Sequence, residues 1–427
     1  MENVNKENNS NFILFIKREC VDYLMIIYFL FLTLLPLVSI ISLITLTVLF
    51  VFGGNYRNLF SIMKKDFMIK LFLGYYLLHV FGIFYSTNLT YGFKDLQTKL
   101  SFLIVPLVFS GLTISKERFS KIKSSFIFSS AISLSVLFFI SAKKYLFNSD
   151  LNEFVYSKLA HSGHSTYLSI YFNLAMLFVL EKYYRDDKKF PVGLTAVLFF
   201  FLYIGILLLS ARTATFVTII SVAFYPILLF GKTFFKEKIW HVHVLFLFFM
   251  SALLFGYLHY NNRFNQVEQE IVLRTNSANA ESIQQEAPNS TNIRLHIWKN
   301  SVELIGRNPI LGVGIGDIKE ELVNIYTENN YQYGIQSRIS PHNQFLHTGV
   351  ILGIVGILFL TAYLLLPMVI AFKNKDWLYL IFLFVIIVNC LTESILEREA
   401  GILFFTVFNT CFYLQLISKK VSIENSN

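Results

Sequence analysis

Long uninterrupted apolar runs are the feature of this sequence that most constrains its fold. The clearest one extends from Val192 to Phe230 and carries a single full charge, Arg212, near its centre. Continuous runs of about 15 to 25 residues are typical of membrane-spanning helices, whereas the strands of a membrane barrel alternate over about 10 residues. The sequence therefore predicts an all-α polytopic membrane protein.

The composition agrees with this fold class. The chain is 55% hydrophobic and only 15% charged, whereas a soluble domain has about 25% charged residues. Its formal net charge is +9, but basic residues collect in the cytoplasmic loops of multispan proteins, so no nucleic-acid partner is predicted. Cys20, Cys390 and Cys411 have no paired spacing, which argues against a disulfide framework or a thiolate metal site.

The apolar segments predict about twelve spans. Two short spans share residues 23–52, and the others lie near 67–86, 100–114, 123–142, 165–181, 191–210, 213–231, 241–260, 343–371, 377–392 and 400–418. The chain then divides into a tail (1–22), spans 1 to 9 (23–260), a large loop (261–341), spans 10 to 12 (342–418) and a second tail (419–427).

Basic residues fall in every second loop of this topology when the N-terminus is inside, as the positive-inside rule requires. The inside groups are Arg57, Lys64 and Lys65; Lys116, Arg118, Lys121 and Lys123; Lys182, Arg185, Lys188 and Lys189; Lys232, Lys236 and Lys238; Lys373 and Lys375; Lys419 and Lys420. Outside lie the turn at Arg212, the loop 143–164, the large loop, whose second half is predicted to contain short helices, and the segment 392–400.

Two arginines on the predicted outer face are candidates for binding an anion. Arg212 lies in a tight turn between two spans, where the positive-inside rule does not explain it. Arg294 lies on an amphipathic helix of the large loop, with Trp298 one turn later on the same face. A forked guanidinium suits a phosphate or diphosphate group. The alternatives are an interfacial anchor for Arg212 and an ordinary solvated arginine for Arg294.

His342, in the stretch "SPHNQFLHTGVILGIVGI", is the candidate general base. Ser340 is predicted to cap a span that begins at Pro341, which places His342 in its first turn. The positive end of the helix dipole disfavours an imidazolium there, so a neutral histidine that accepts a proton is expected. The alternative is a structural histidine at the interface, and His347 is predicted to be structural.

The remaining motifs carry weaker signals. "LGVGIGD" (311–317) has the wrong third spacing for a dinucleotide fingerprint and is interpreted as a turn. "HSGHS" (161–165) has no acidic partner nearby in sequence, so no metal site is predicted. "RDDKK" (185–189) falls on the inside, away from the other candidates. Glu393, Glu397 and Arg398 lie outside and are expected either to orient a base or an acceptor, or to form surface pairs.

Taken together, these segments resemble the bacterial O-antigen ligase family, which shares features with O-antigen polymerases and protein O-oligosaccharyltransferases. "LSART", "IRLHIW", "NPILGVGIGD" and "SPHNQFLHTGVILGIVG" occur in the family's order. The resemblance implies a membrane glycosyltransferase of the C class that moves a glycan from undecaprenyl diphosphate to lipid A-core. It also implies an inverting reaction without a metal or other cofactor.

The same resemblance implies roles and a location. Arg212 and Arg294 match the arginines that hold the diphosphate, and His342 matches the histidine that acts on the acceptor hydroxyl. Candidate supporting residues are Trp298, Asn343, Glu393 and Arg398. The protein would lie in the bacterial inner membrane with both termini cytoplasmic and the site periplasmic.

Three other functions stay open at the level of sequence. A polymerase would use the same lipid-linked donor with a growing glycan as acceptor, and a protein O-oligosaccharyltransferase would use a protein. A transporter or lipid flippase is the alternative from another class, but it predicts polar residues near the midplane of several spans. The candidates in this sequence lie instead at one membrane face.

Overall fold

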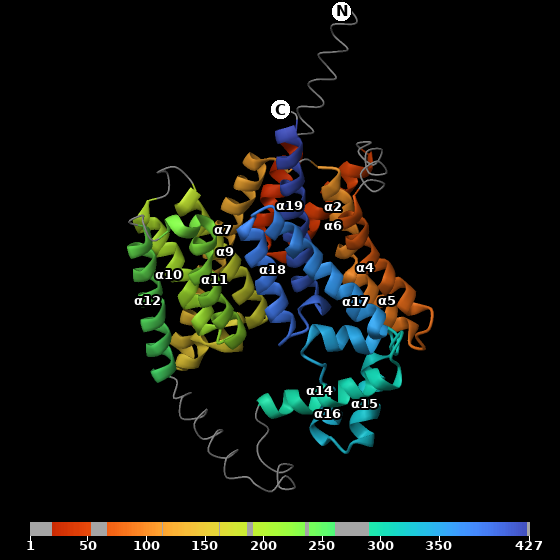
Figure 1. The fold of residues 1–427 in the computed structure, drawn as a ribbon. Helices are drawn as coiled ribbons and strands as arrows, with labels where there is room; N and C mark the ends of the chain where they lie inside the picture. Colours follow the sequence, from red (N-terminus) through yellow and green to blue (C-terminus); the bar gives the residue numbers. More distant parts are fainter. Residues whose placement is uncertain are drawn as a thin grey trace, which may run out of the picture.

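The computed structural model describes residues 19–52, 66–112, 114–161, 163–185, 191–234, 239–260 and 290–424. Within these ranges the chain is helical and contains no strand, which confirms the predicted all-α class. Figure 1 shows a helical bundle with a smaller group of helices below it. The predicted first half of the large loop lies outside the described residues, as do residues 1–18 of the first predicted tail and residues 425–427 of the second.

The apolar helices follow the apolar segments of the sequence. Residues 19–31 are helical, and the principal helices after them are α2 (Pro36–Phe52), α4 (Phe67–Ile83), α7 (Lys116–Asn148), α9 (Ser165–Arg185), α10 (Val192–Leu208), α11 (Arg212–Phe230), α12 (Ile239–Tyr260), α17 (Gln344–Lys373), α18 (Trp377–Cys390) and α19 (Glu399–Glu424). The shorter elements are α5 (Leu89–Lys99), α6 (Ser101–Ser110), η1 (Leu151–Phe154), α8 (Tyr156–Ala160), η2 (Gly231–Thr233), α14 (Ser290–Arg307), α15 (Ile318–Glu328), α16 (Gln332–Ser337) and η4 (Ile395–Glu397).

Five helical segments in the described part of the chain are long and apolar enough to cross a membrane. They are Lys116–Asn148, Arg212–Phe230, Trp240–Tyr257, Gln344–Lys373 and Glu399–Lys419. Four further apolar helices, α2, α4, α10 and α18, are shorter. The count of twelve spans and the large extramembrane loop therefore remain predictions.

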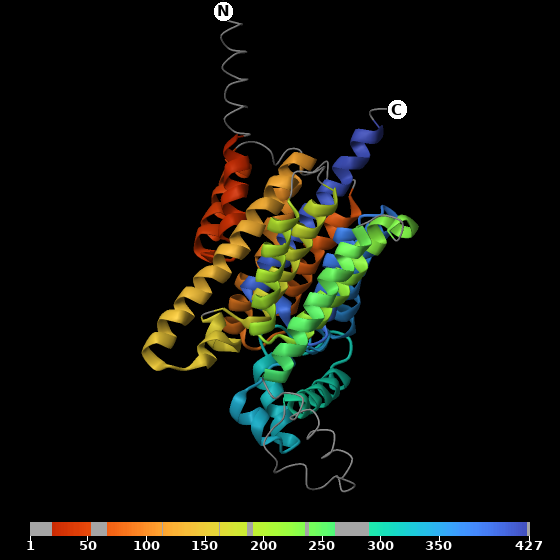
Figure 2. The same cartoon turned by 90° about the vertical axis from the view of Figure 1, so that its left-hand side faces the viewer.

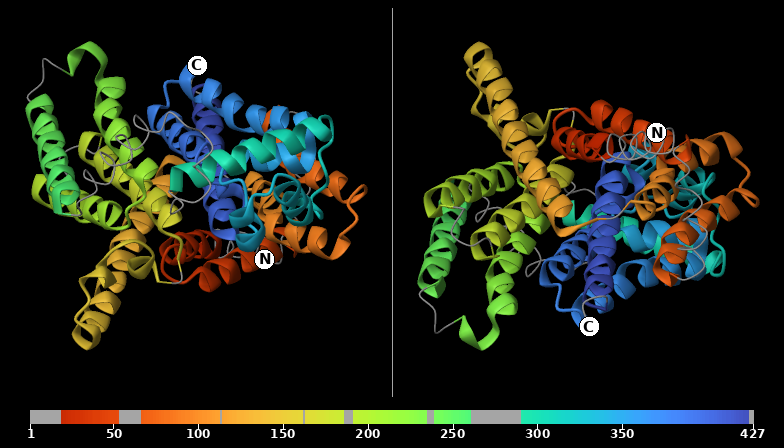
Figure 3. Two further views of the ribbon diagram at one scale, coloured as in Figure 1. Left: turned by 90° about the horizontal axis from the view of Figure 1, so that it is seen from below. Right: turned by 90° about the horizontal axis from the view of Figure 1, so that it is seen from above.

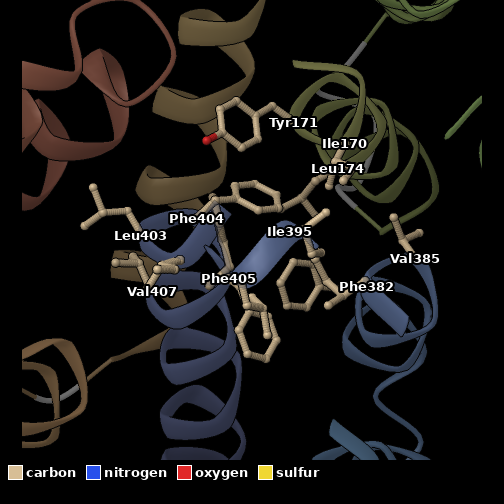
Figure 4. Packing of buried hydrophobic residues seen from close by; sticks show 14 of the residues in the cluster. Ile170, Tyr171, Leu174, Phe382, Val385, Ile395, Leu403, Phe404, Phe405 and Val407 are labelled. Atoms are coloured by element: carbon tan, nitrogen blue, oxygen red, sulfur yellow. The ribbon is translucent and has the colours of Figure 1, made fainter. Parts of the chain in front are cut away.

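Helix α19 lies at the centre of the packed core. Figure 4 shows Phe404 and Phe405 of α19 beside Phe382 of α18 and Tyr171 of α9. The rings of Tyr171 and Phe404 are 4.5 Å apart between centroids, and those of Phe382 and Phe404 are 5.9 Å apart. Residues 401–416 of α19 are buried throughout, and they include the polar Thr406 and Asn409 among the apolar side chains.

Basic residues from three helices meet at one end of the bundle, which we call the basic end. A cavity of about 280 Å³ there is lined by Lys116 and Lys123 of α7, Lys182 and Arg185 of α9, and Lys419 of α19. The structure thus brings together three groups that the positive-inside pattern assigns to one side. Arg57, Lys64, Lys65, Lys188, Lys189, Lys236 and Lys238 lie outside the described residues.

The group α14–α16 lies at the opposite end of the bundle (Figures 2 and 3). The segment after α14 contains turns, as predicted. It also pairs with α17 where that helix is interrupted at Gly353 (φ 60°, ψ −155°). Val313 N donates to Val350 O at 2.8 Å, and Ile354 N donates to Pro309 O at 2.8 Å. These bonds satisfy backbone groups that the interruption leaves without helical partners.

Asp317, at the end of the same segment, fixes it to the turn between α4 and α5. Its carboxylate accepts hydrogen bonds from Thr87 N at 2.7 Å and from Asn88 N at 2.8 Å. The "LGVGIGD" stretch is therefore a docking segment that holds α14 and α15 against the bundle.

Gly353→Ala is expected to lower the stability of the protein by about 1–3 kcal/mol or more. The added Cβ would lie 2.3 Å from Ile310 O, at a backbone with φ +60° that only glycine adopts readily. Thermal unfolding in detergent measures the change. Gly306→Ala on α14 is the matched control, since a Cβ there meets nothing within 4 Å. Equal stability of the two variants would contradict the prediction.

Candidate active site

Helix α17 begins later than predicted. Asn343 is its N-cap, and its Oδ1 accepts hydrogen bonds from Phe345 N at 2.9 Å and Leu346 N at 3.1 Å. The prediction that Ser340 caps the helix and that His342 lies in the first turn is therefore wrong. His342 instead precedes the cap, with a left-handed φ of 46°. The amide side chain of Asn343 satisfies the first helical N–H groups, so the helix starts at Gln344.

His342 pairs with Glu393, which lies between α18 and α19. The distance from His342 Nδ1 to Glu393 Oε1 is 2.7 Å. Because an ionised carboxylate only accepts hydrogen bonds, this contact assigns the proton of a neutral imidazole to Nδ1. The lone pair then lies on Nε2, and the side chain of His342 is 29% exposed. This arrangement suits a histidine that removes a proton from a bound hydroxyl.

The charges around Glu393 hold it in the ionised form. Burial by itself would raise the pKa of this carboxyl group, but the hydrogen bond and charge of His342 lower it below the ordinary value. His164 and Arg294 lower it further through their charges. An ionised Glu393 can therefore stabilise the positive charge that His342 gains when it accepts a proton.

The lowered pKa of Glu393 predicts a specific dependence of stability on pH. Its stabilising contribution is fully present above the ordinary glutamate value of 4.5 and is lost as the pH falls through the lower native value. We expect the native protein to be more stable than Glu393→Gln at neutral pH, and the difference to shrink below about pH 4.5. Thermal unfolding of both proteins at several pH values measures this, and a difference that does not change in acid would contradict it.

Helix α14 brings Trp298 and Arg294 to His342. The indole Nε1 of Trp298 donates to Pro341 O at 3.0 Å, so it holds the residue that precedes His342. Arg294 lies one turn earlier on α14 and is half-buried. Its charge acts on Glu393, which places the guanidinium within electrostatic reach of the His342–Glu393 pair. The structure therefore brings Arg294, Trp298, His342 and Glu393 together.

Arg212 is the first residue of α11 and is exposed. Asn173, eight residues after the start of α9, donates to Thr218, six residues after the start of α11, at 2.7 Å, so the two helices begin at nearly the same level. His164 immediately precedes α9 and interacts electrostatically with Glu393. Arg212 therefore lies at the same end of the bundle as the pair, although no contact within the described residues joins it to them.

His164 and Arg398 lie within electrostatic reach of the pair. Burial lowers the pKa of His164, and the charges of Glu393, Arg398 and His342 all act on it. The Nδ1 atom of His164 is buried and has no hydrogen-bond partner among the described atoms. His164 of the "HSGHS" motif thus lies near the pair, whereas His161 Nδ1 lies 3.1 Å from Lys144 Nζ. No group of three His, Cys, Asp or Glu residues in the described ranges could hold a metal ion.

A second polar group, centred on Glu397, lies close by and was not predicted as a unit. Glu397 contacts Lys99 Nζ at 2.5 Å, Gln344 Nε2 at 2.7 Å and His347 Nε2 at 2.9 Å. Lys99 also contacts Asp95 at 2.6 Å. The i,i+4 spacing of Asp95 and Lys99 was a signal in the sequence. Gln344 lies in the stretch "SPHNQFLHTGVILGIVG", but the sequence assigned it no role.

Residues 196–361 match the family model described as O-antigen ligase. The chain contains an O-antigen ligase domain. The resemblance inferred from the sequence is confirmed over this range, which covers less than half of the 427 residues. No curated protein matches the chain.

The ligase domain includes most of the candidate site. Arg212, Arg294, Trp298, His342 and Asn343 fall inside it, whereas Glu393 and Arg398 follow it. The match to this family model, together with the apolar helices, supports a multi-pass membrane protein with glycosyl transfer of the O-antigen ligase or polymerase type. The family implies a lipid-linked glycan as donor.

Proposed function

We propose that this protein is an O-antigen ligase that transfers a glycan from undecaprenyl diphosphate to lipid A-core. The observation that supports this most directly is the His342–Glu393 pair with Arg294 beside it. The pair lies at the end of the bundle opposite the basic end. By the positive-inside rule the basic end is cytoplasmic, so the site would face the periplasm and both termini the cytoplasm.

The chemistry follows from these groups. The hydroxyl oxygen of the acceptor attacks the anomeric carbon of the donor glycan, and Nε2 of His342 accepts the proton of that hydroxyl. The bond from that carbon to the diphosphate oxygen breaks, and undecaprenyl diphosphate leaves with the electron pair. Attack opposite the leaving group inverts the anomeric centre.

Charge stabilisation completes the proposed mechanism. Arg212 and Arg294 would stabilise the negative charge that grows on the diphosphate, a form of stabilisation that is often the largest single contribution to catalysis. Glu393 would stabilise the imidazolium of His342. The donor supplies the free energy of transfer, so we expect the reaction to need no nucleotide, metal or other cofactor.

Transfer by the purified protein tests this proposal. Protein in detergent is mixed with undecaprenyl-diphosphate-linked glycan and lipid A-core, without nucleotide and without a membrane gradient. We expect glycan to appear on lipid A-core. A transporter would transfer nothing under these conditions, and that result would overturn the proposal.

A polymerase is the closest alternative, because it would use the same donor and the same groups with a growing glycan as acceptor. Deletion of the gene separates the two functions. Loss of a ligase leaves core without any glycan repeat and long glycan on the lipid carrier, whereas loss of a polymerase leaves core that carries one repeat. Loss of glycoprotein with unchanged lipopolysaccharide would instead indicate a protein acceptor.

A further inference from the structure

We propose that Gln344, anchored by Glu397, is a positioning residue that holds Glu393 against His342. This inference rests on the proposed role of His342 as the general base. It assigns a function in the reaction to a buried polar group that neither the family match nor the sequence motifs single out.

The two residues that follow His342 form hydrogen bonds with the backbone on both sides of Glu393. Asn343 Nδ2 donates to Leu391 O at 3.0 Å, two residues before Glu393. Gln344 Oε1 accepts from Leu396 N at 2.8 Å, three residues after it. The segment 391–396 is therefore attached at both ends to the two residues that follow His342, which restricts the distance between His342 and Glu393.

Glu397 anchors Gln344 in turn. Its Oε1 accepts from Gln344 Nε2 at 2.7 Å, while its Oε2 contacts Lys99 Nζ and His347 Nε2. Gln344 and the side chain of Lys99 are both 0% exposed. The carboxylate thus joins α5, α17 and the segment before α19, and a buried ion pair of this kind holds its partners in one arrangement.

The charges of this group favour the same arrangement. Burial alone would raise the pKa of Glu397, but the charges of His347 and Lys99 hold it well below its ordinary value. Glu397 therefore stays ionised and remains an acceptor for Gln344. If Gln344 lost this hold, the segment 391–396 could shift, and a shift of about 1 Å at a catalytic pair can reduce turnover by about 10²-fold.

A double-mutant cycle tests whether Gln344 acts through Glu393. Gln344→Ala, Glu393→Ala and the double variant are purified, and kcat and KM for donor and acceptor are measured in the transfer assay. We expect Gln344→Ala to lower kcat by up to about 10²-fold and to leave both KM values within about threefold. In the Glu393→Ala background, Gln344→Ala should change kcat by no more than about twofold, because Glu393, which Gln344 positions, has already been removed.

Two further variants keep the test informative. Gln344→Met retains the length of the side chain and removes its hydrogen bonds, so it replaces Gln344→Ala if the smaller residue prevents folding. Tyr171→Phe is the matched structural control. It deletes the 2.7 Å hydrogen bond from Tyr171 Oη to Ala400 O, close to Glu397 in the chain but outside the attachments of the segment 391–396. We expect it to leave kcat within about threefold of the native value.

Failure of this inference is distinct from failure of the proposed function. One outcome is that His342→Ala is inactive, while the fold losses of kcat in Gln344→Ala and Glu393→Ala multiply in the double variant. Gln344 then has only a structural role, and the inference is overturned. If His342→Ala retains near-native turnover, the proposed general base is wrong and the positioning role is overturned with it. If Tyr171→Phe lowered kcat as much as Gln344→Ala does, that result would also contradict a specific role for Gln344.

Discussion

His342→Ala is expected to reduce transfer of glycan by about 10²–10⁴-fold while the protein remains folded. The side chain supplies Nε2 as the proton acceptor, and Glu393 at 2.7 Å from Nδ1 assigns the tautomer. We expect removal of the imidazole to leave donor binding intact, because the proposed diphosphate contacts come from α11 and α14. The loss should therefore appear in kcat, with the donor KM within about threefold of the native value.

His241→Gln is the matched control for this variant. His241 is exposed near the start of α12, at the basic end, far along the chain from the pair. We expect its turnover to be unchanged, and size-exclusion chromatography should show the same particle for both variants. If the His342→Ala protein transferred glycan at a near-native rate, the general-base assignment would be wrong.

Arg294→Ala and Arg212→Ala are each expected to lower kcat by about 10²–10³-fold and to raise the donor KM. Negative charge grows on the diphosphate as the glycosidic bond breaks, so the loss of a guanidinium affects the transition state more than the bound donor. Arg212→Lys should recover only part of the activity, since lysine keeps the charge but lacks the planar fork that binds two phosphate oxygens. Steady-state kinetics with purified donor measures both effects.

Each arginine has a matched control. Arg307 lies on α14 with Arg294, but it pairs with Glu303 at 2.8 Å and Glu328 at 2.7 Å on an exposed surface. Arg185 ends α9 at the basic end, 3.7 Å from Glu181. Alanine at either position should change kcat by no more than about threefold, because exposed ion pairs contribute little. If Arg212→Ala kept native donor affinity and turnover, Arg212 would be an interfacial anchor and not a diphosphate ligand.

The residue types of the site were visible in the sequence, but their contacts were not. Arg212 was recognised as a charge in an apolar tract. Arg294 was recognised on an amphipathic segment of the large loop, and His342 at the start of an apolar run. His342 and Glu393 are 51 residues apart in the chain, and Lys99 and Glu397 are 298 apart. A pairing across such separations depends on how helices pack, so no local pattern predicts it.

The start of α17 shows how a local rule can fail. Ser340 and Pro341 formed a good capping sequence, yet Asn343 caps the helix. The deciding contact is long-range, since the amide of Asn343 also donates to Leu391 O at 3.0 Å. From the sequence alone, the helix dipole was the one expected influence on His342. In the structure the imidazole ring also interacts with the carboxylate of Glu393.

The sequence by itself determined the all-helical class, the apolar segments and the arginine and histidine candidates, because apolar runs and unexpected charges are local properties of the chain. Only the tertiary structure decided that Glu393 orients His342, that α14 carries Arg294 to this pair, and that Gln344 and Glu397 hold the segment between α18 and α19. These features arise from side chains on helices distant in sequence, whose relative positions are set by packing around α19 and by the interrupted α17.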